Sequence, residues 1–146
     1  FTEYVGAPAA TASTKRSGLV LSDDVGYREN DGYLYILGRI DDVAQLKNGG
    51  WITVNAIERE VAALACVKDV AAVISTESEQ IKVGMLVLLG EDPGEAIHVA
   101  EMEVSVRRAF PDQAILLKTL VAKEIPRLAS GKTDRVTIRN MLGWSK

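Results

Sequence analysis

The chain has 146 residues, 47% of them hydrophobic and 25% charged, which is enough for one ordinary domain around a buried core. Its formal net charge is −3, but residues 118–146 carry seven basic and two acidic side chains, which favours either an anionic ligand near that end or a solvated basic helix face. The longest nearly apolar run, residues 83–89, is too short to span a bilayer, and the sparse aromatic residues, 5%, are not interleaved with basic ones, which argues against nucleic-acid binding.

The N-terminal part of the chain predicts irregular structure followed by a hairpin. Residues 1–18 are rich in small and polar residues and are expected to be irregular. They contain no basic start followed by an apolar block, so no signal peptide is predicted, and because the sequence does not begin with Met we expect a piece of a longer protein. The strands of a β-hairpin are expected at residues 18–21 with 25–27 and at 33–37, around a turn at 29–32.

The next segment predicts a short strand and a helix. The strand at residues 43–47 is stopped by an Asn-Gly-Gly turn, and a helix is expected at 55–66 because apolar residues recur there at helical spacing. Asn55 and Glu58, three residues apart, are expected to cap it. The only cysteine, Cys66, excludes an internal disulfide, fits a reducing and therefore cytoplasmic compartment, and is expected to be a small buried apolar residue.

The second half predicts further strands at residues 70–75, 81–89 and 114–122, and helices at 96–110 and from Thr133 or Asp134 to about Leu142. The first of these helices contains His98, which we expect to be structural and without partners, so no Cys/His cluster predicts a transition metal. The order of elements indicates an α+β fold, with helices on one face of a sheet.

Lys132 lies in a Gly-Lys-Thr triplet, which also closes the phosphate-binding loop of many nucleotide enzymes. That loop needs a glycine at position 126, where this chain has Pro126, which has no backbone N–H to donate. The phosphate-loop interpretation therefore fails. What remains is a flexible Ser-Gly step from which one lysine projects, and its ammonium group suits a phosphate or a carboxylate.

Residues 126–135, PRLASGKTDR, resemble the C-terminal signature Pro-Arg-x-x-Ser-Gly-Lys-x-x-Arg of the AMP-forming acyl-CoA synthetases, in the adenylate-forming superfamily. Residues 22–42 are similar to the family's Thr-Gly-Asp…Asp-Gly-Tyr…Gly-Arg-x-Asp-Asp block, and residues 46–61 to its Lys-x-Gly-Gly-x-x-Ile…Glu-x-Glu block. The first residues, FTEYVGAPAAT, are similar to the segment that leads into these blocks. Any one motif alone is weak evidence, but three in the expected order are strong.

The resemblance implies the small C-terminal domain of these enzymes, an α+β fold with a central sheet of about three strands, flanking helices and a two-stranded β element. A β-hairpin from the large N-terminal domain precedes it. By this correspondence residues 1–39 are the end of the large domain, residues 40–42 the hinge, and residues 43–146 the mobile small domain. The ATP and acid pockets belong to the large domain, which is the missing partner, so the fragment alone is expected to be inactive.

The resemblance also implies an acid–thiol ligase that works in two steps. A carboxylic acid, fatty or similar, reacts with ATP to give an acyl-adenylate, and coenzyme A then displaces AMP. Lys132 corresponds to the catalytic cation that bridges the carboxylate and the phosphate, Asp24 and Arg39 to nucleotide-binding residues, and Asp41 to the hinge position. Mg²⁺ is expected to arrive with ATP, liganded largely outside this chain.

Coenzyme A binding is expected at Gly49, Gly50 and Trp51, because the family's glycines there let the backbone approach the pantetheine arm. Two departures from the family pattern are visible. Its Thr-Gly-Asp is Ser22-Asp23-Asp24 here, which leaves open which aspartate meets the ribose, and Trp51 follows Gly50 directly where many relatives carry one more residue.

Two alternatives stay open. The first is an adenylation domain that loads the phosphopantetheine of a carrier protein, although no carrier-like segment follows the last motif. The second is a stand-alone small domain with a regulatory role and no catalysis of its own, in which Lys132 is an acylation target.

Overall fold

The computed structural model describes residues 3–77, 80–90, 95–111 and 115–144. The chain divides into two compact units, Phe1–Ile40 and Asp41–Lys146. The division falls in a 3-10 turn, η1 (Ile40–Asp42), which coincides with the segment expected to be a hinge. The domain boundaries and the hinge nevertheless remain predictions.

The first unit begins with a helix where irregular chain was expected. Its elements are α1 (Pro8–Thr14), β1 (Lys15–Arg16), β2 (Leu19–Val20), β3 (Asp24–Arg28) and β4 (Leu34–Arg39). Pro8 occupies the first turn of α1, where a missing N–H costs nothing, and the Thr11 hydroxyl accepts from the backbone N–H of Tyr4 at 2.9 Å. The prediction for residues 18–21 is also corrected, because β2 pairs with β1 rather than with the following hairpin.

The expected hairpin is formed by β3 and β4, which pair antiparallel from Asp24 opposite Arg39 to Arg28 opposite Leu34. At its turn the Asp31 carboxylate accepts from the backbone N–H of Tyr33 at 2.9 Å and from the Tyr35 hydroxyl at 3.1 Å. These contacts fix the register that places Asp24 beside Arg39 at the open end of the hairpin.

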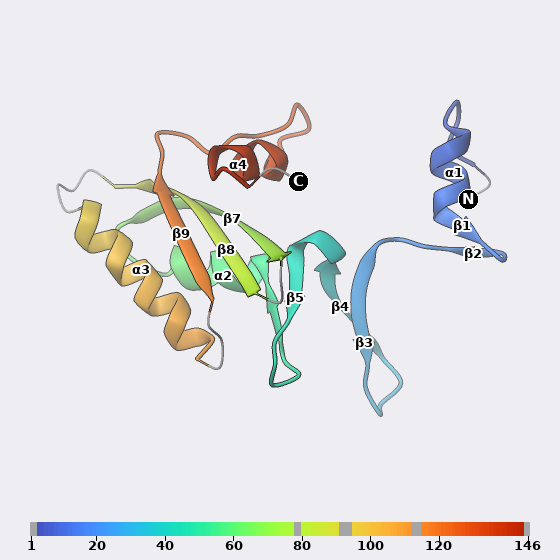
Figure 1. Ribbon diagram of the computed structural model, residues 1–146, viewed down its shortest axis with the longest axis horizontal. Helices are drawn as coiled ribbons and strands as arrows, with labels where there is room; N and C mark the ends of the chain where they lie inside the picture. The colour runs from blue at the N-terminus through green and yellow to red at the C-terminus, as the bar shows by residue number, and fades with distance from the viewer. Residues whose placement is uncertain (1–2, 78–79, 91–94, 112–114, 145–146) are drawn as a thin grey trace. The chain divides into compact units, whose positions relative to one another are not determined.

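The second unit is an α+β fold around a three-stranded sheet, as expected, in the order β7-β8-β9 (Figure 1). Its elements are β5 (Val43–Gln45), β6 (Trp51–Thr53), α2 (Val54–Ala62), β7 (Val67–Glu77), β8 (Gln80–Leu89), α3 (Glu95–Ala109), β9 (Leu116–Val121) and α4 (Arg135–Met141). β7 runs antiparallel to β8, β9 runs parallel to it, and β5 pairs with β6 as a separate two-stranded element.

Helices cover both faces of this sheet, not one face as expected. Val83, Met85 and Val87 of β8 face a core that α2 and α3 complete. The alternate residue Leu86 faces a second core with Ile138 of α4. The nearly continuous apolar run of β8 is therefore explained by burial on both faces, and α4 lies on the opposite side of the sheet from α2 and α3 (Figure 1).

The predicted helix cap is wrong by two residues. Thr53, not Asn55, caps α2, because its hydroxyl accepts from the backbone N–H of Ala56 at 3.1 Å. Glu58 is consequently available for a contact outside its own helix, and α2 ends at Ala62 rather than at Cys66. None of the helices in the described part of the chain has the length and apolar character needed to cross a membrane.

Candidate functional site

Lys132 lies in a small closed loop between β9 and α4. The backbone N–H of Leu128 donates to the Lys132 carbonyl at 2.8 Å, and that of Gly131 donates to the Leu128 carbonyl at the same distance. Gly131 has φ of +81°, which a residue with a Cβ rarely adopts. The Lys132 side chain is exposed and makes no hydrogen bond or ion pair with any residue that the structure describes. The loop therefore holds the backbone and leaves the ammonium group available.

The base of this loop is attached to the sheet and to α4. Arg127 forms an ion pair with Asp69 of β7 at 2.8 Å. Asp134 caps α4 by accepting from the Thr137 backbone N–H at 3.0 Å and from its hydroxyl at 2.7 Å. These two hydrogen bonds hold the pKa of Asp134 below its usual range. The expected cap is confirmed, with Asp134 as the capping residue.

Asp24 and Arg39, both predicted to bind nucleotide, lie side by side in the first unit. The Arg39 guanidinium is 3.6 Å from the Asp24 carboxylate and 3.4 Å from that of Asp23, and it also donates to the Ser22 carbonyl. Asp23 has φ of +56°, a conformation that the family's glycine would adopt without strain. The two carboxylates and the guanidinium offer both acceptors and a cation, which are the groups that ribose hydroxyls and a phosphate require.

Gly49 and Gly50 lie on the turn between β5 and β6, and Trp51 is the first residue of β6. Gly49 has φ of +87°, and a Cβ added there would meet nothing within 4 Å. The turn is closed by the Leu46 N–H, which donates to the Gly50 carbonyl at 2.8 Å. The backbone is thus bare on one side, as the approach of a ligand requires, although the coenzyme A role of these residues stays a prediction.

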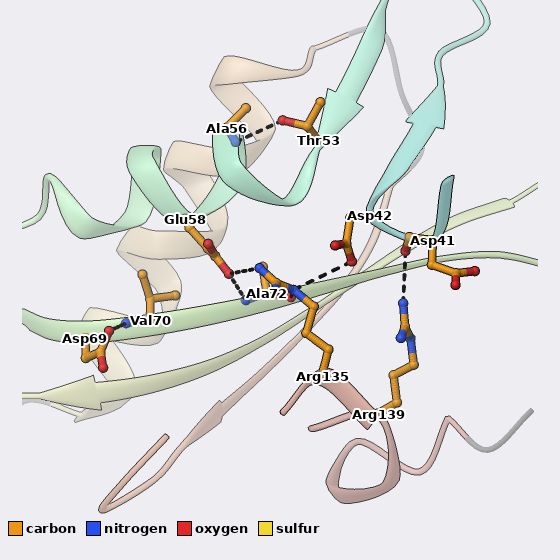
Figure 2. Close-up of polar contacts among 10 residues, drawn as sticks. All are labelled: Asp41, Asp42, Thr53, Ala56, Glu58, Asp69, Val70, Ala72, Arg135 and Arg139. Atoms are coloured by element: carbon orange, nitrogen blue, oxygen red, sulfur yellow. Dashed lines mark hydrogen bonds and ion pairs between the residues drawn. The ribbon is translucent and has the colours of Figure 1, made fainter. Parts of the chain in front are cut away.

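Two arginines of α4 reach the start of the second unit (Figure 2). The Arg139 guanidinium donates to the backbone carbonyl of Asp41 at 2.9 Å. Arg135 lies 3.6 Å from the Asp42 carboxylate and 3.1 Å from that of Glu58. Sequence reasoning did not single out Arg135 or Arg139 individually. The signal that could have found Arg135 is its place as the last arginine of the Lys132 motif.

Glu58, whose carboxylate Arg135 contacts at 3.1 Å, has a raised pKa. Burial raises its pKa, and this effect outweighs the opposing hydrogen bond from the Ala72 N–H, at 2.9 Å, and the attraction of Arg135. The repulsion from Asp42 acts in the same direction as burial. Burial therefore disfavours the charged form of Glu58, and Arg135 partly offsets this cost.

Cys66, His98 and Glu101 come together, which corrects the expectation that His98 has no partners. One donor atom from each residue lies within 4.8 Å of the other two. The His98 Nδ1 and a Glu101 carboxylate oxygen are 3.5 Å apart, one helical turn from each other on α3. Cys66, predicted to be simply buried, is half-buried and faces this pair.

No family model matches this chain. It is 32% identical over 118 residues, 79% of its length, to acyl-CoA synthetase short-chain family member 3, mitochondrial, from Bos taurus, of which it covers 17%. It is 29% identical over 147 aligned residues, 95% of its length, to the human acyl-coenzyme A synthetase ACSM3, mitochondrial, of which it covers 24%. The chain thus spans about a fifth of the length of these relatives.

The fold is also similar to that of part of a solved enzyme. The O-succinylbenzoate coenzyme A synthetase MenE from Bacillus subtilis, in complex with AMP, matches 99% of this chain with a TM-score of 0.69 and 21% identity. The chain covers 28% of that structure. At this level of identity the likeness establishes the shared fold alone.

Proposed function

Because this chain belongs to the acyl-CoA synthetases of the adenylate-forming superfamily, we propose that it is the C-terminal part of an AMP-forming acid–thiol ligase. The whole enzyme joins a carboxylic acid to AMP with ATP and then transfers the acyl group to coenzyme A. The chain has the length of only about a fifth of its relatives, so we assign the pockets for ATP and acid to a large domain outside residues 1–146.

The observation that carries this proposal is the exposed Lys132 on its closed loop. Negative charge develops on the α-phosphate when the carboxylate attacks, and a cation held at that point stabilises the transition state. Lys132 has an ammonium group with no described partner to compete for it, and a backbone fixed by two hydrogen bonds of 2.8 Å. A lysine already engaged in an ion pair would have to break that contact first.

We propose that the remaining predicted residues serve the same reaction. Asp24 and Arg39 bind the ribose and phosphate, and their mutual ion pair at 3.6 Å keeps both side chains near one point before the nucleotide arrives. The Gly49 turn receives the pantetheine arm of coenzyme A. Residues 40–42 form the hinge between residues 1–39 and residues 43–146, so that Lys132 and the Gly49 turn act in different steps.

We propose ATP, Mg²⁺ and coenzyme A as co-substrates and a fatty or similar carboxylic acid as the substrate. We assign the acid pocket to the large domain, so that domain would determine which acid length is accepted. A cytoplasmic location remains a prediction, and the two relatives named above are called mitochondrial.

The test uses the protein in which the large domain is joined to this chain. Lys132→Ala should slow pyrophosphate release from ATP and acid by about 10²–10³-fold, the usual cost of one such electrostatic contact. Thioester formation from preformed acyl-adenylate and coenzyme A should change little. Lys123→Ala, which removes another exposed lysine near the same loop, is the matched control and should leave both half-reactions intact.

Two outcomes would contradict the assignment. If Lys132→Ala slows both half-reactions equally, or no more than Lys123→Ala does, the lysine does not act on the phosphate. If residues 1–146 alone release pyrophosphate from ATP and a panel of acids, the chain is not a dependent fragment. Transfer to a carrier-protein phosphopantetheine but not to coenzyme A would support the carrier-loading alternative.

A further inference from the structure

The contact between Cys66, His98 and Glu101 lies away from the Lys132 loop, and the proposed ligase reaction does not use it. Cys66 lies in the turn between α2 and β7, where its carbonyl accepts from the backbone N–H of Gly90 at 2.9 Å. His98 and Glu101 lie on α3, which packs against α2 over the same core. We propose that these three side chains form a binding site for Zn²⁺.

The arrangement of the donor atoms favours a metal site over a catalytic relay. In a relay the thiol and the carboxylate contact opposite nitrogens of the imidazole, which sets sulfur and oxygen roughly 7 Å apart. Here the donor atoms of all three residues lie within 4.8 Å of one another, as the corners of a triangle. The Cys66 sulfur and the Glu101 oxygen are therefore too close together to contact opposite nitrogens of the His98 ring, and one ion can contact all three residues.

The donor set suits zinc. Thiolate, imidazole and carboxylate bind Zn²⁺ at about 2.0–2.3 Å in a tetrahedron, which places ligand atoms about 3.3–3.8 Å apart. The His98–Glu101 separation of 3.5 Å already meets this spacing. The thiol can be at most 4.8 Å away, so it must approach by no more than about an ångström, which a rotation of side chains supplies.

Both ring nitrogens of His98 are buried, so an ion bound there would be held firmly, with Glu101 as its movable ligand. The His98 side chain is 14% exposed, whereas that of Glu101 is 57% exposed and can move to close over an ion. Three protein ligands leave the fourth tetrahedral position to water or another group. A bound ion would connect the α2–β7 turn to α3, two segments separated by about thirty residues, and so stabilise the folded unit.

The experiment uses the tag-free chain of residues 1–146, freed of metal with a chelator and titrated with Zn²⁺ and, as a spectroscopic probe, Co²⁺. We expect one ion per chain, a thiolate-to-cobalt charge-transfer band and a zinc-dependent rise in the unfolding temperature. Cys66→Ser and His98→Gln should weaken binding by more than the roughly 10–100-fold cost of losing an outer-shell group, and Cys66→Ser should abolish the band. Glu101→Gln should weaken binding less, because its side chain is largely exposed.

The matched control is Glu103→Gln, which removes the same charge from the same helix but from a carboxylate that faces Thr119 at 3.4 Å. It should bind zinc like the wild type. Each variant is checked for its metal-free unfolding temperature, so that a loss of fold is not taken for a loss of ligand. The proposal is overturned if the chain does not retain zinc, or if Cys66→Ser and His98→Gln bind zinc as well as the wild type. It is also overturned if Cys66 is alkylated rapidly, if this rate depends on His98, and if zinc does not slow it, because a catalytic relay would behave in that way.

Discussion

Replacing Arg135 by methionine should destabilise residues 41–146 in a manner that depends on pH. Arg135 donates to the Glu58 carboxylate at 3.1 Å and to the Ala72 carbonyl at 3.3 Å, and these bonds join α4 to α2 and β7. The Arg135 and Glu58 side chains are only 25% and 23% exposed, so water cannot fully replace the lost contacts. Methionine keeps much of the apolar length of the side chain but offers no donor.

The size of the effect follows from these contacts. A hydrogen bond to a charged group contributes about 1.5–3 kcal/mol, and breaking a fully buried ion pair costs about 3–5 kcal/mol. Because about a quarter of each side chain is exposed, we expect the lower part of this span, about 2 kcal/mol of unfolding free energy at pH 7. For a unit of this size that lowers the unfolding temperature by roughly 10 °C.

The pH dependence comes from Glu58, whose pKa burial raises above the ordinary 4.5. Between 4.5 and the raised value the folded protein binds more protons than the unfolded chain, so stability falls as pH rises through this window. Removing Arg135 removes an attraction and a hydrogen bond that both lower the pKa, so the pKa rises further and the window extends upward. The loss in Arg135→Met therefore grows as pH rises through this window and shrinks as pH falls toward 4.5.

The assay is urea unfolding, followed by circular dichroism, at several pH values between 5 and 7. Glu58→Gln keeps an oxygen for the Ala72 N–H but removes the charge, so Arg135→Met in that background should lose the pH dependence. Arg108→Met, at an exposed position on α3, is the control and should change stability by less than about 0.5 kcal/mol. An Arg135→Met loss that is equal at pH 5 and pH 7, or undiminished in the Glu58→Gln background, would refute the reasoning.

Three further predictions concern other contacts. Gly84→Ala should cost about 1–3 kcal/mol in urea unfolding by overpacking, since its Cβ would lie 2.3 Å from Leu142 Cδ1, and an unchanged midpoint would contradict this packing. Asp134→Ala should destabilise α4 above pH 3.8 but not in strong acid, because the charged cap, whose pKa is lowered, loses its stabilising effect as pH falls through the folded-state pKa. Asp134→Asn should keep the hydrogen bond from the Thr137 N–H. Equal pH profiles of stability for the wild type and Asp134→Ala would exclude this role. In the enzyme with its large domain, Asp41→Pro should retain adenylation and lose thioester formation because φ becomes fixed, with Asp41→Ala much milder; a folded proline variant that runs both steps would exclude a pivot there.

Much of the second unit could be predicted because its elements follow local patterns. β8 is a run of apolar residues, α3 has helical spacing and a proline after it, and Asp134 precedes α4 as a capping residue. The errors occurred where several local choices were nearly equal. Thr53 and Asn55 are both good capping residues. Because β6 pairs with β5 up to Thr53, the helix begins directly after Thr53, which becomes the cap. α1 was missed because a short stretch of Ala, Thr and Ser has no apolar stripe to reveal a helix.

The candidate sites also differ in whether local sequence patterns predict them. Lys132 and the Gly49 turn could be proposed from the sequence because each belongs to a contiguous motif. The Glu58–Arg135 ion pair and the approach of Cys66 to His98 join residues far apart in the chain, so no sequence spacing predicts these contacts. Only the His98–Glu101 spacing, one helical turn on α3, is local in the sequence, and the prediction that His98 has no partners overlooked it.

The α4 arginines bear on where the hinge that we propose can turn. Arg139 binds the Asp41 carbonyl at 2.9 Å, and Arg135 lies 3.6 Å from the Asp42 carboxylate, so the chain from the Asp41 carbonyl onward is attached to α4. On the other side, the Ile40 N–H donates to the Asp23 carbonyl at 2.8 Å and so belongs to the first unit. The torsions between these two attachments, φ and ψ of Ile40 and φ and ψ of Asp41, are the ones left to rotate. A substitution that releases the Arg139 contact should therefore spread the rotation over more residues, whereas proline at position 41 acts directly on the torsions that remain.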